Sequence, residues 1–341
     1  LCGENILIDV RTAQEYKKGS IPDAFNYPVF DNFERAEIGL IYREIGKNAA
    51  VAKGLEFFEP KIQQFISSLT DLKSKRLVVF CARGGMRSAS VVRLLQYQGF
   101  CAARLQGGYK NYRSYVLKQL REPVSQLIVL HGRTGVGKTL LLKKLPDYLD
   151  LEEFAGHRSS LFGAINKIPQ TQKNFEALLA KKILELPNTR PVFIEGESRK
   201  VGKVFIPQAL AEAMKSGTLV LLQASLDTRI RRIVEEYKIC DEQSFLQTDS
   251  ILQSMQKVLG KKKTEQLRQW LRKGEFENIV HVLLEEYYDP RYQHAMRMNE
   301  YALKLSAEDL NSAAEKLVQF RNGIVSCRDN ILQTAQNNKL N

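Results

Sequence analysis

The chain has 341 residues, of which 44% are hydrophobic and 26% are charged, a balance that excludes long disorder and favours two or more folded domains. Its 51 Lys and Arg residues outnumber 38 Asp and Glu residues, and the net charge of +13 favours a polyanionic partner. No apolar run approaches the roughly 20 residues that a membrane-spanning helix needs, so we expect no membrane association.

The five cysteines are widely spaced and form no C-x-x-C pair. This spacing predicts neither a disulfide framework nor a zinc site, and it is typical of a reducing compartment. The first residues show no secretory leader pattern, so we expect a cytoplasmic protein. The cysteines are Cys2, Cys81, Cys101, Cys240 and Cys327.

Strand and helix signals alternate along the first 121 residues. This alternation predicts a parallel sheet with helices on its faces. The predicted strands are residues 6–10 and 77–80, and the predicted helices are residues 13–18, 55–69 and 88–98.

A second α/β unit begins near Glu122, with predicted strands at residues 126–130, 191–194 and 219–223. Beyond Asp227 the strand signals fade, and charged helical sequence continues to the end. We therefore expect an α/β protein in three parts. They are a domain of residues 1–121, a second domain of residues 122–227, and a mainly helical region of residues 228–341 packed on the second domain.

Residues 81–87 read C-A-R-G-G-M-R and lie between a predicted strand and a predicted helix. A loop in this position directs backbone N–H groups toward an anion, and glycines permit the backbone angles that this requires. The helix end and two arginines should lower the pKa of the cysteine thiol, although a buried structural cysteine is the alternative. The candidate catalytic residues are Cys81, Arg83, Gly84, Gly85 and Arg87.

The spacing Cys-x5-Arg alone leaves two chemistries open, because tyrosine phosphatases use it as well. Residues 8–28, which begin I-D-V-R-T and include G-S-I-P-D-A, resemble the opening signature of rhodanese domains. Residues 105–109, L-Q-G-G-Y, are similar to the closing segment of those domains. The resemblance implies a rhodanese-like fold in which Cys81 carries sulfur or selenium, with the loop amides, Arg83 and Arg87 stabilising the transferred anion.

Residues 132–139 read G-R-T-G-V-G-K-T and match the P-loop pattern G-x-x-x-x-G-K-[ST] between a strand and a helix. The loop amides should surround a diphosphate, the lysine should reach its outer phosphate, and Thr139 could bind Mg²⁺. The candidate phosphate-binding residues are Gly132, Arg133, Thr134, Gly135, Val136, Gly137, Lys138 and Thr139.

Glu195 ends a predicted strand and is the expected partner carboxylate of the P-loop, with a plain surface carboxylate as the alternative. Arg158 and Arg199 are further candidates for this second site. No motif specific for adenine or guanine is evident, and N-K-x-D in particular is missing. The P-loop therefore predicts a diphosphate-bearing ligand that need not be a nucleotide.

The order of the two modules and several further stretches resemble the tRNA 2-selenouridine synthase family. The resemblance extends from residue 6 to about residue 300. The further stretches are residues 34–39, 49–54, 150–152, 157–158, 162–163, 197–199 and 284–292.

This resemblance implies an enzyme that acts on 2-thiouridine at the wobble position of tRNA. It implies S-geranylation from geranyl diphosphate, then replacement of the S-geranyl group by selenium from selenophosphate, with Cys81 as the selenium position. A selenophosphate-supplying protein is a further expected partner. We add the hypothesis that the P-loop holds the diphosphate of geranyl diphosphate. The alternative function is a rhodanese-type sulfurtransferase coupled to a nucleotide-binding P-loop module without tRNA chemistry.

Other features leave functional and structural interpretations open. A basic stretch of residues 261–273 could contact RNA or form a solvated helix face. Trp270 is interpreted as core, and the tyrosines as packing residues that could instead stack a base. His157, beside Arg158, is either a site residue or a structural histidine. The tyrosines are Tyr287, Tyr288 and Tyr292, and the other histidines, His131, His281 and His294, show no metal-ligand spacing.

Overall fold

The computed structural model describes residues 5–124, 126–196, 198–291 and 298–340, and in the last helix it describes side chains up to Ser326. The chain divides into two compact units. Unit 1 comprises Leu1–Arg121 and Thr171–Lys181, and unit 2 comprises Glu122–Gln170 and Lys182–Asn341. No helix among the described residues is long and apolar enough to cross a membrane.

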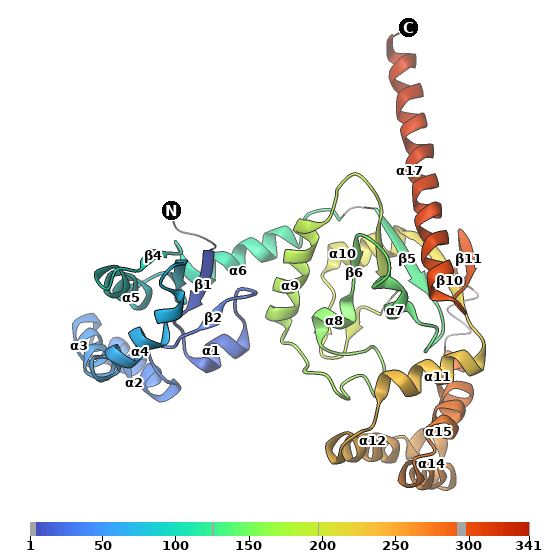
Figure 1. Cartoon of the computed structure of the whole chain (residues 1–341), viewed down its shortest axis with the longest axis horizontal. Helices are drawn as coiled ribbons and strands as arrows, with labels where there is room; N and C mark the ends of the chain where they lie inside the picture. Colours follow the sequence, from blue (N-terminus) through green and yellow to red (C-terminus); the bar gives the residue numbers. More distant parts are fainter. Residues whose placement is uncertain (1–4, 125, 197, 292–297, 341) are drawn as a thin grey trace. The chain divides into compact units, whose positions relative to one another are not determined.

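Unit 1 is built on a parallel sheet with strand order β2-β1-β3-β4 (Figure 1). Its strands are β1 (Asn5–Asp9), β2 (Phe25–Asn26), β3 (Arg76–Phe80) and β4 (Cys101–Arg104). Its helices are α1 (Ala13–Lys18), α2 (Asn32–Glu44), α3 (Lys47–Phe58), η1 (Glu59–Lys61), α4 (Ile62–Ser68), η2 (Thr70–Leu72), α5 (Met86–Tyr97) and α6 (Gly108–Gln119). This confirms the predicted parallel α/β class for the first part of the chain.

The prediction of a single helix over residues 55–69 is wrong, because the structure has α3, the short turn η1 and α4 in this region. Pro60 lies in η1. Proline lacks a backbone N–H and clashes with the preceding helical turn, so a continuous helix ends there. The cysteine spacing predicts no disulfide framework, but Cys101 is disulfide-bonded. Sequence spacing does not set the distance between two thiols. Cys2 and the side chain of Cys327 lie outside the described residues.

A buried ion pair at the end of β1 holds the first segment of unit 1 together. Arg11 donates to both carboxylate oxygens of Asp9, with Nη2 2.6 Å from Oδ2, and also to the carbonyl oxygen of Gly19. Ser20 donates its hydroxyl to Asp9, and the guanidinium of Arg11 lies 4.0 Å from the ring centre of Tyr109. The rhodanese-like signature is therefore one hydrogen-bonded network.

We predict that Asp9→Asn destabilises unit 1 by about 3–5 kcal/mol, because it leaves the Arg11 guanidinium buried without a counter-charge. Asp9 and Arg11 are 0% and 4% exposed, so water cannot replace the lost partner. Urea unfolding of the full chain measures the change. The double variant Asp9→Asn, Arg11→Met should recover part of the loss, and a single-variant cost below about 1 kcal/mol would contradict the prediction.

Unit 2 contains a parallel five-stranded sheet with strand order β11-β10-β5-β7-β6 among the described residues. Its strands are β5 (Leu127–His131), β6 (Tyr148–Leu149), β7 (Val192–Glu195), β10 (Thr218–Gln223) and β11 (Leu303–Ser306), and a separate hairpin pairs β8 (Lys200–Val201) with β9 (Val204–Phe205). The helices that accompany them are α7 (Lys138–Leu142), α8 (Leu151–Ala155), α10 (Gln208–Ser216) and α17 (Leu310–Leu340). Helix α9 (Gln172–Glu185) belongs to unit 1 up to Lys181 and to unit 2 from Lys182.

The region after Asp227 is not wholly helical. Its strand β11 pairs with β10 at the edge of the sheet, which the weak strand signal did not predict. Ala313, Ala314 and Leu317 of α17 then pack into the core under the sheet. The C-terminal part of the chain therefore completes the P-loop unit.

The helices between β10 and β11 have a core of their own. Leu252, Met255, Leu267, Leu271, Ile279 and Leu283 form it. The helices are α11 (Leu226–Tyr237), α12 (Glu242–Ser254), α13 (Gln256–Leu259), α14 (Lys261–Lys273) and α15 (Phe276–Leu283), which continues into the π-helical turn η3 (Leu284–Tyr288). We call residues 226–288 the helical region; its helices α11, α12, α14 and α15 are labelled in Figure 1.

Candidate functional site

The Cys81 loop connects the end of β3 to the first turn of α5 in unit 1. The thiol is 4% exposed, and Sγ lies 3.3 Å from the Ser88 hydroxyl. Gly85 is the N-cap of α5, and Gly84 has a φ of +63°. The loop amides and the positive end of a 12-residue helix therefore surround the thiol, as anion binding requires.

Burial opposes ionisation of Cys81, but hydrogen bonds and charge outweigh it. The Ser88 hydroxyl, the backbone amides of Ser88 and Arg83, and the Arg87 guanidinium hold the pKa of the Cys81 thiol below its ordinary value. A thiol of this kind is a better nucleophile near neutral pH than a free cysteine. The geometry favours a reactive residue over a structural one.

The segment after β4 packs against the Cys81 loop and binds the carbonyl groups of that loop. The amide of Tyr109 donates to the carbonyl of Cys81, and the amide of Lys110 donates to that of Ala82, each at 2.9 Å. A Cβ on Gly108 would lie 2.2 Å from the Cys81 carbonyl oxygen, and the φ of Gly108 is +57°. Only glycine fits there, which explains the second glycine of L-Q-G-G-Y.

The two arginines predicted for this loop lie in different surroundings. Arg87 is largely buried and donates to Glu15 of α1, with Nη1 2.8 Å from Oε2. Arg83 is exposed. Glu15 belongs to the opening signature, but its sequence position did not show that it pairs with Arg87.

The P-loop connects β5 to α7 in unit 2, as expected for the motif. Gly135 and Gly137 have φ of +78° and +94°, in the left-handed region where glycine is favoured. The Lys138 amine lies 3.4 Å from the Gly132 carbonyl oxygen. The motif residues Thr134–Thr139 line one cleft together with Glu152 and Arg158.

Two carboxylates converge on the hydroxyl of Thr139. Its Oγ1 lies 3.2 Å from Oε2 of Glu195 and 3.3 Å from Oε2 of Glu152. Glu195 is fully buried at the end of β7, and its Oε1 accepts from the amide of Glu152. No group of three or more His, Cys, Asp or Glu able to hold a metal occurs among the described residues.

Comparison with known proteins identifies both modules of the chain. A family model described as the tRNA 2-selenouridine synthase AAA domain matches residues 125–320, and a rhodanese-like domain model matches residues 2–115. The chain belongs to the tRNA 2-selenouridine synthase family.

Curated relatives named tRNA 2-selenouridine synthase match most of this chain. Those from Shewanella sp. (strain MR-7) and Sulfurovum sp. (strain NBC37-1) are 32% and 31% identical. These matches cover 85% and 86% of this chain, and 88% and 89% of the relatives. A solved N-terminal domain of an ATP/GTP-binding protein from Clostridium difficile 630 is 41% identical, covers 33% of this chain and 90% of its own, and has a TM-score of 0.33.

Two arginines that the sequence did not single out hold the P-loop of this family member. Arg229 is 2% exposed and donates to the Thr134 carbonyl at 2.8 Å. Arg232 is 8% exposed and donates to the Val136 carbonyl at 2.7 Å. Arg229 also pairs with Asp289, which accepts from Arg133 as well. An arginine pair three residues apart on a charged helix has the pattern of a surface, so no sequence signal identified them.

The other predicted second-site residues separate into two places. Arg158 lines the P-loop cleft, pairs with Glu236 at 2.6 Å and stacks on Tyr237. Arg199 lies elsewhere in unit 2, on a cavity of about 600 Å³ that His131 also lines. Burial, and then the charge of Lys138, lower the pKa of His131. The structure therefore associates Arg158 and Glu195 with the P-loop and assigns Arg199 to a different cavity.

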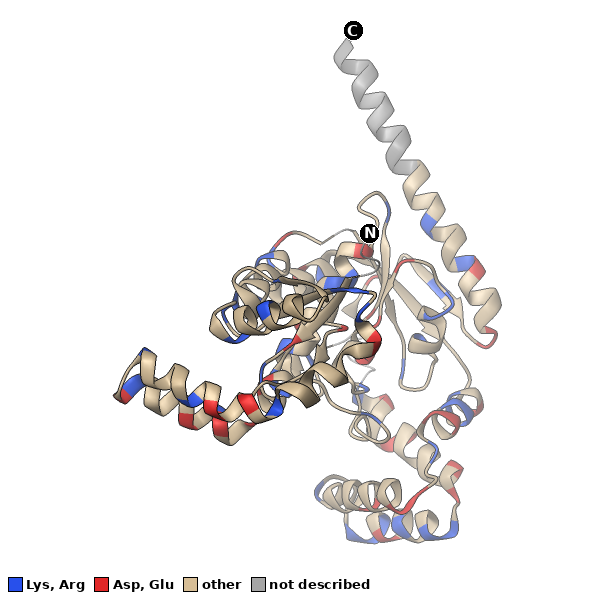
Figure 2. Ribbon diagram, turned by 60° about the vertical axis from the view of Figure 1, so that its left-hand side comes forward, with Lys and Arg blue, Asp and Glu red and all other residues tan. Residues whose placement is uncertain are grey.

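Internal contacts account for much of the basic stretch in α14. Arg268 pairs with Asp249, Lys263 with Glu286 and Arg272 with Glu265. Acidic segments lie among the basic ones in these helices (Figure 2). Trp270, Tyr287 and Tyr288 pack against the core of the helical region, which confirms their interpretation as packing residues. Glu197, Tyr292 and His294 lie outside the described residues.

We predict that the alkylation rate of Cys81 rises with pH around an inflection below the value of about 8.5 for a free thiol. Arg87→Ala should raise this pKa because it removes a positive charge. Glu15→Gln should lower it because Arg87 loses its compensating carboxylate. Mass spectrometry of the Cys81 peptide after iodoacetamide labelling measures the alkylation rate at each pH. One common inflection in all three proteins would contradict the role of Arg87.

Asp150 is the buried N-cap of α8, and this helix contains Glu152 of the P-loop cleft. Burial raises the pKa of Asp150 from 3.8 to about 6. The stability that Asp150 contributes is thus present below about pH 4 and is lost as pH rises through 6. Asp150→Asn keeps the cap but does not titrate, so it should be more stable than wild type at pH 7, by at most about 3 kcal/mol. Thermal unfolding of wild type and Asp150→Asn at pH 4 and pH 7 tests this prediction. The same difference in stability between the two proteins at both pH values would contradict it.

Proposed function

We propose that this chain converts 2-thiouridine at the wobble position of tRNA to 2-selenouridine, by geranyl transfer from geranyl diphosphate and then selenium transfer from selenophosphate. One observation carries the proposal. A thiol of lowered pKa in an anion-binding loop and a P-loop with converging carboxylates occur in one chain. The curated relatives are named for the same product. The chain is thus a transferase that acts on tRNA.

The first transfer makes the thiocarbonyl sulfur of the base the nucleophile. It attacks the first carbon of the geranyl chain, the C–O bond to the diphosphate breaks, and the diphosphate leaves with the electron pair. The base loses its N3 proton to solvent. The amides of the P-loop and Lys138 stabilise the charge that develops on the leaving diphosphate. This step needs no ATP hydrolysis.

The second transfer replaces sulfur by selenium at C2 of the base. Water attacks the phosphorus of selenophosphate, the P–Se bond breaks, and hydrogen selenide anion is released together with orthophosphate. The selenide attacks C2 and forms the C–Se bond, while its proton passes to N3 of the base. The C–S bond breaks with its electron pair on sulfur, and a solvent proton converts the leaving thiolate to geranylthiol. Alkylation in the first step matters because a thiolate leaves from C2 far more readily than a sulfide dianion. Cys81 and the amides of its loop hold the anionic selenium in this proposal, with Arg87 beside them.

Mg²⁺ fits the oxygen ligands beside the P-loop. It prefers carboxylate, hydroxyl and phosphate oxygens and usually shares its site with substrate phosphates. The Thr139 hydroxyl and the Glu152 and Glu195 carboxylates are such ligands, and they meet at the end of the P-loop. When bound, Mg²⁺ would neutralise negative charge on the leaving diphosphate.

The partners in this proposal follow from charge and chemistry. A net charge of +13 favours the phosphate backbone of tRNA, which occurs in the cytoplasm. A protein that supplies selenophosphate is a further partner.

The test compares Cys81→Ser, Lys138→Ala and wild type on tRNA that contains 2-thiouridine. After incubation with geranyl diphosphate and then selenophosphate, mass spectrometry of the nucleosides identifies the product. The serine variant should stop at the geranylated base, because it lacks the selenium position. The alanine variant should never reach the geranylated base, because it lacks the lysine charge that stabilises the leaving diphosphate.

Arg93→Ala is the matched control for the first module, because Arg93 is exposed on α5, outside the Cys81 loop. It should retain more selenation than the Cys81 variant. Full selenation by both Cys81→Ser and Lys138→Ala would overturn the assignment. A strict need for ATP in the geranyl step would overturn the P-loop role alone, and sulfur transfer without any change in the tRNA would favour the sulfurtransferase alternative.

A further inference from the structure

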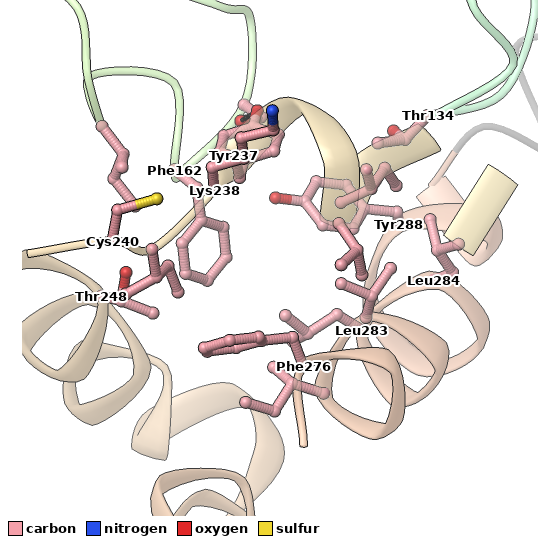
Figure 3. Close-up of a pocket in the computed structure, with 17 residues that line it drawn as sticks. Thr134, Phe162, Tyr237, Lys238, Cys240, Thr248, Phe276, Leu283, Leu284 and Tyr288 are labelled. Atoms are coloured by element: carbon pink, nitrogen blue, oxygen red, sulfur yellow. Dashed lines mark hydrogen bonds between the residues drawn. The ribbon is translucent and has the colours of Figure 1, made fainter. Parts of the chain in front are cut away.

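A cavity of about 290 Å³ lies in unit 2 between the helical region and the segment that follows α8 (Figure 3). Figure 3 shows the rings of Phe162 and Phe276 and the side chain of Leu283 around one space. We call it the apolar pocket; its walls include Phe162, Ile233, Phe276, Ile279, Val280 and Leu283. Its volume is at the lower end of the roughly 300–1,000 Å³ of small-molecule sites.

Several polar groups on the wall of the apolar pocket are bonded within the protein. The Tyr237 hydroxyl lies 2.7 Å from the Ser160 hydroxyl, and Thr248 donates its hydroxyl to the Ser244 carbonyl at 2.8 Å. Burial raises the pKa of Tyr237 and Tyr288, so both phenols stay neutral. The pocket therefore offers mainly carbon surface to an occupant.

The apolar pocket adjoins the P-loop cleft. Thr134, Ser160, Ile233 and Tyr237 line both. Thr134 belongs to the P-loop itself, and its carbonyl is held by Arg229. One ligand can therefore place a phosphate group on the loop amides and an apolar group among the helices.

A buried ion pair connects the two parts of this combined site. Arg229 donates to Thr134 of the P-loop and, at 2.9 and 2.6 Å, to Asp289. Asp289 directly follows η3, whose residues Leu284 and Tyr288 line the apolar pocket. A shift of the pocket wall would thus disturb the loop, which is expected if both parts hold one molecule.

We propose that the apolar pocket binds the isoprenoid chain of a prenyl diphosphate whose diphosphate occupies the P-loop. The inference rests on the proposed function and adds the subsite that recognises the chain. A nucleobase fits less well, because its buried N–H and carbonyl groups would need hydrogen-bond partners that carbon walls do not supply. An isoprenoid chain has no such groups and gains affinity from burial alone.

The test measures binding to the full chain by calorimetry with inorganic diphosphate, dimethylallyl diphosphate, geranyl diphosphate and ATP. Each buried CH₂ contributes about fourfold in affinity, so geranyl diphosphate should bind at least about tenfold more tightly than dimethylallyl diphosphate. Val280→Phe places a ring in the pocket and should remove at least about tenfold of that affinity, while inorganic diphosphate binds as before. His281→Phe is the matched control: it introduces the same ring at an exposed neighbouring position of α15 and should leave every affinity unchanged.

Three results would overturn the inference. They are unchanged geranyl diphosphate affinity in Val280→Phe, an equal loss of ATP affinity in that variant, and equal wild-type affinity for all the diphosphates. If Val280→Phe loses inorganic diphosphate binding as well, the ring has also disturbed the P-loop through Asp289 and Arg229, and the wild-type ligand series decides. Failure of the proposed function gives a different result. The affinity would still depend on the length of the prenyl chain, but tRNA incubated with geranyl diphosphate would yield no geranylated nucleoside.

Discussion

Two buried arginines of α11 hold the carbonyl oxygens of the P-loop, and this constraint determines what the loop can bind. Arg229 binds the Thr134 carbonyl and Arg232 the Val136 carbonyl. Once these acceptors are occupied from one side, the loop can present its N–H groups to an anion on the other. Asp289 balances the charge of Arg229 and ties the loop to the end of the helical region. The same pair of guanidinium groups therefore joins the P-loop to the helical region and, through the Ala307 carbonyl, to the segment after β11.

The Cys81 loop follows the same principle with different atoms. Its carbonyls at Cys81 and Ala82 accept from the amides of Tyr109 and Lys110, and Gly108 is the residue that allows this close approach. Its own amides then remain beside the thiol, where they lower its pKa. In both units a parallel strand delivers a loop to a helix start, and a distant segment occupies the loop carbonyls. The two loops differ in their functional groups, because one begins with a thiol and the other ends with Lys138 and Thr139.

Sequence reasoning predicted the parts of the molecule in which local pattern and structure agree. The two loops, the strand before each and the helix after each are contiguous in the chain, so motif spacing was sufficient. It missed α2, although Asp31 and Glu34 form a capping box at its start that could have predicted a helix there. It also missed β11, whose four residues become a strand through pairing with β10, some 80 residues earlier in the chain.

The sequence by itself predicted the two glycine-containing loops, the position of Cys81 at the start of one, the lysine and threonine at the end of the other, and the family. These features depend on neighbouring residues whose backbone conformation is set by glycine and by the strand–loop–helix order. Only the tertiary structure decided that Glu152 joins Glu195 at Thr139, that Glu15 pairs with Arg87, and that an apolar pocket adjoins the P-loop. Those groups come from segments far apart in the chain. Their proximity results from packing of the cores, which no local pattern records.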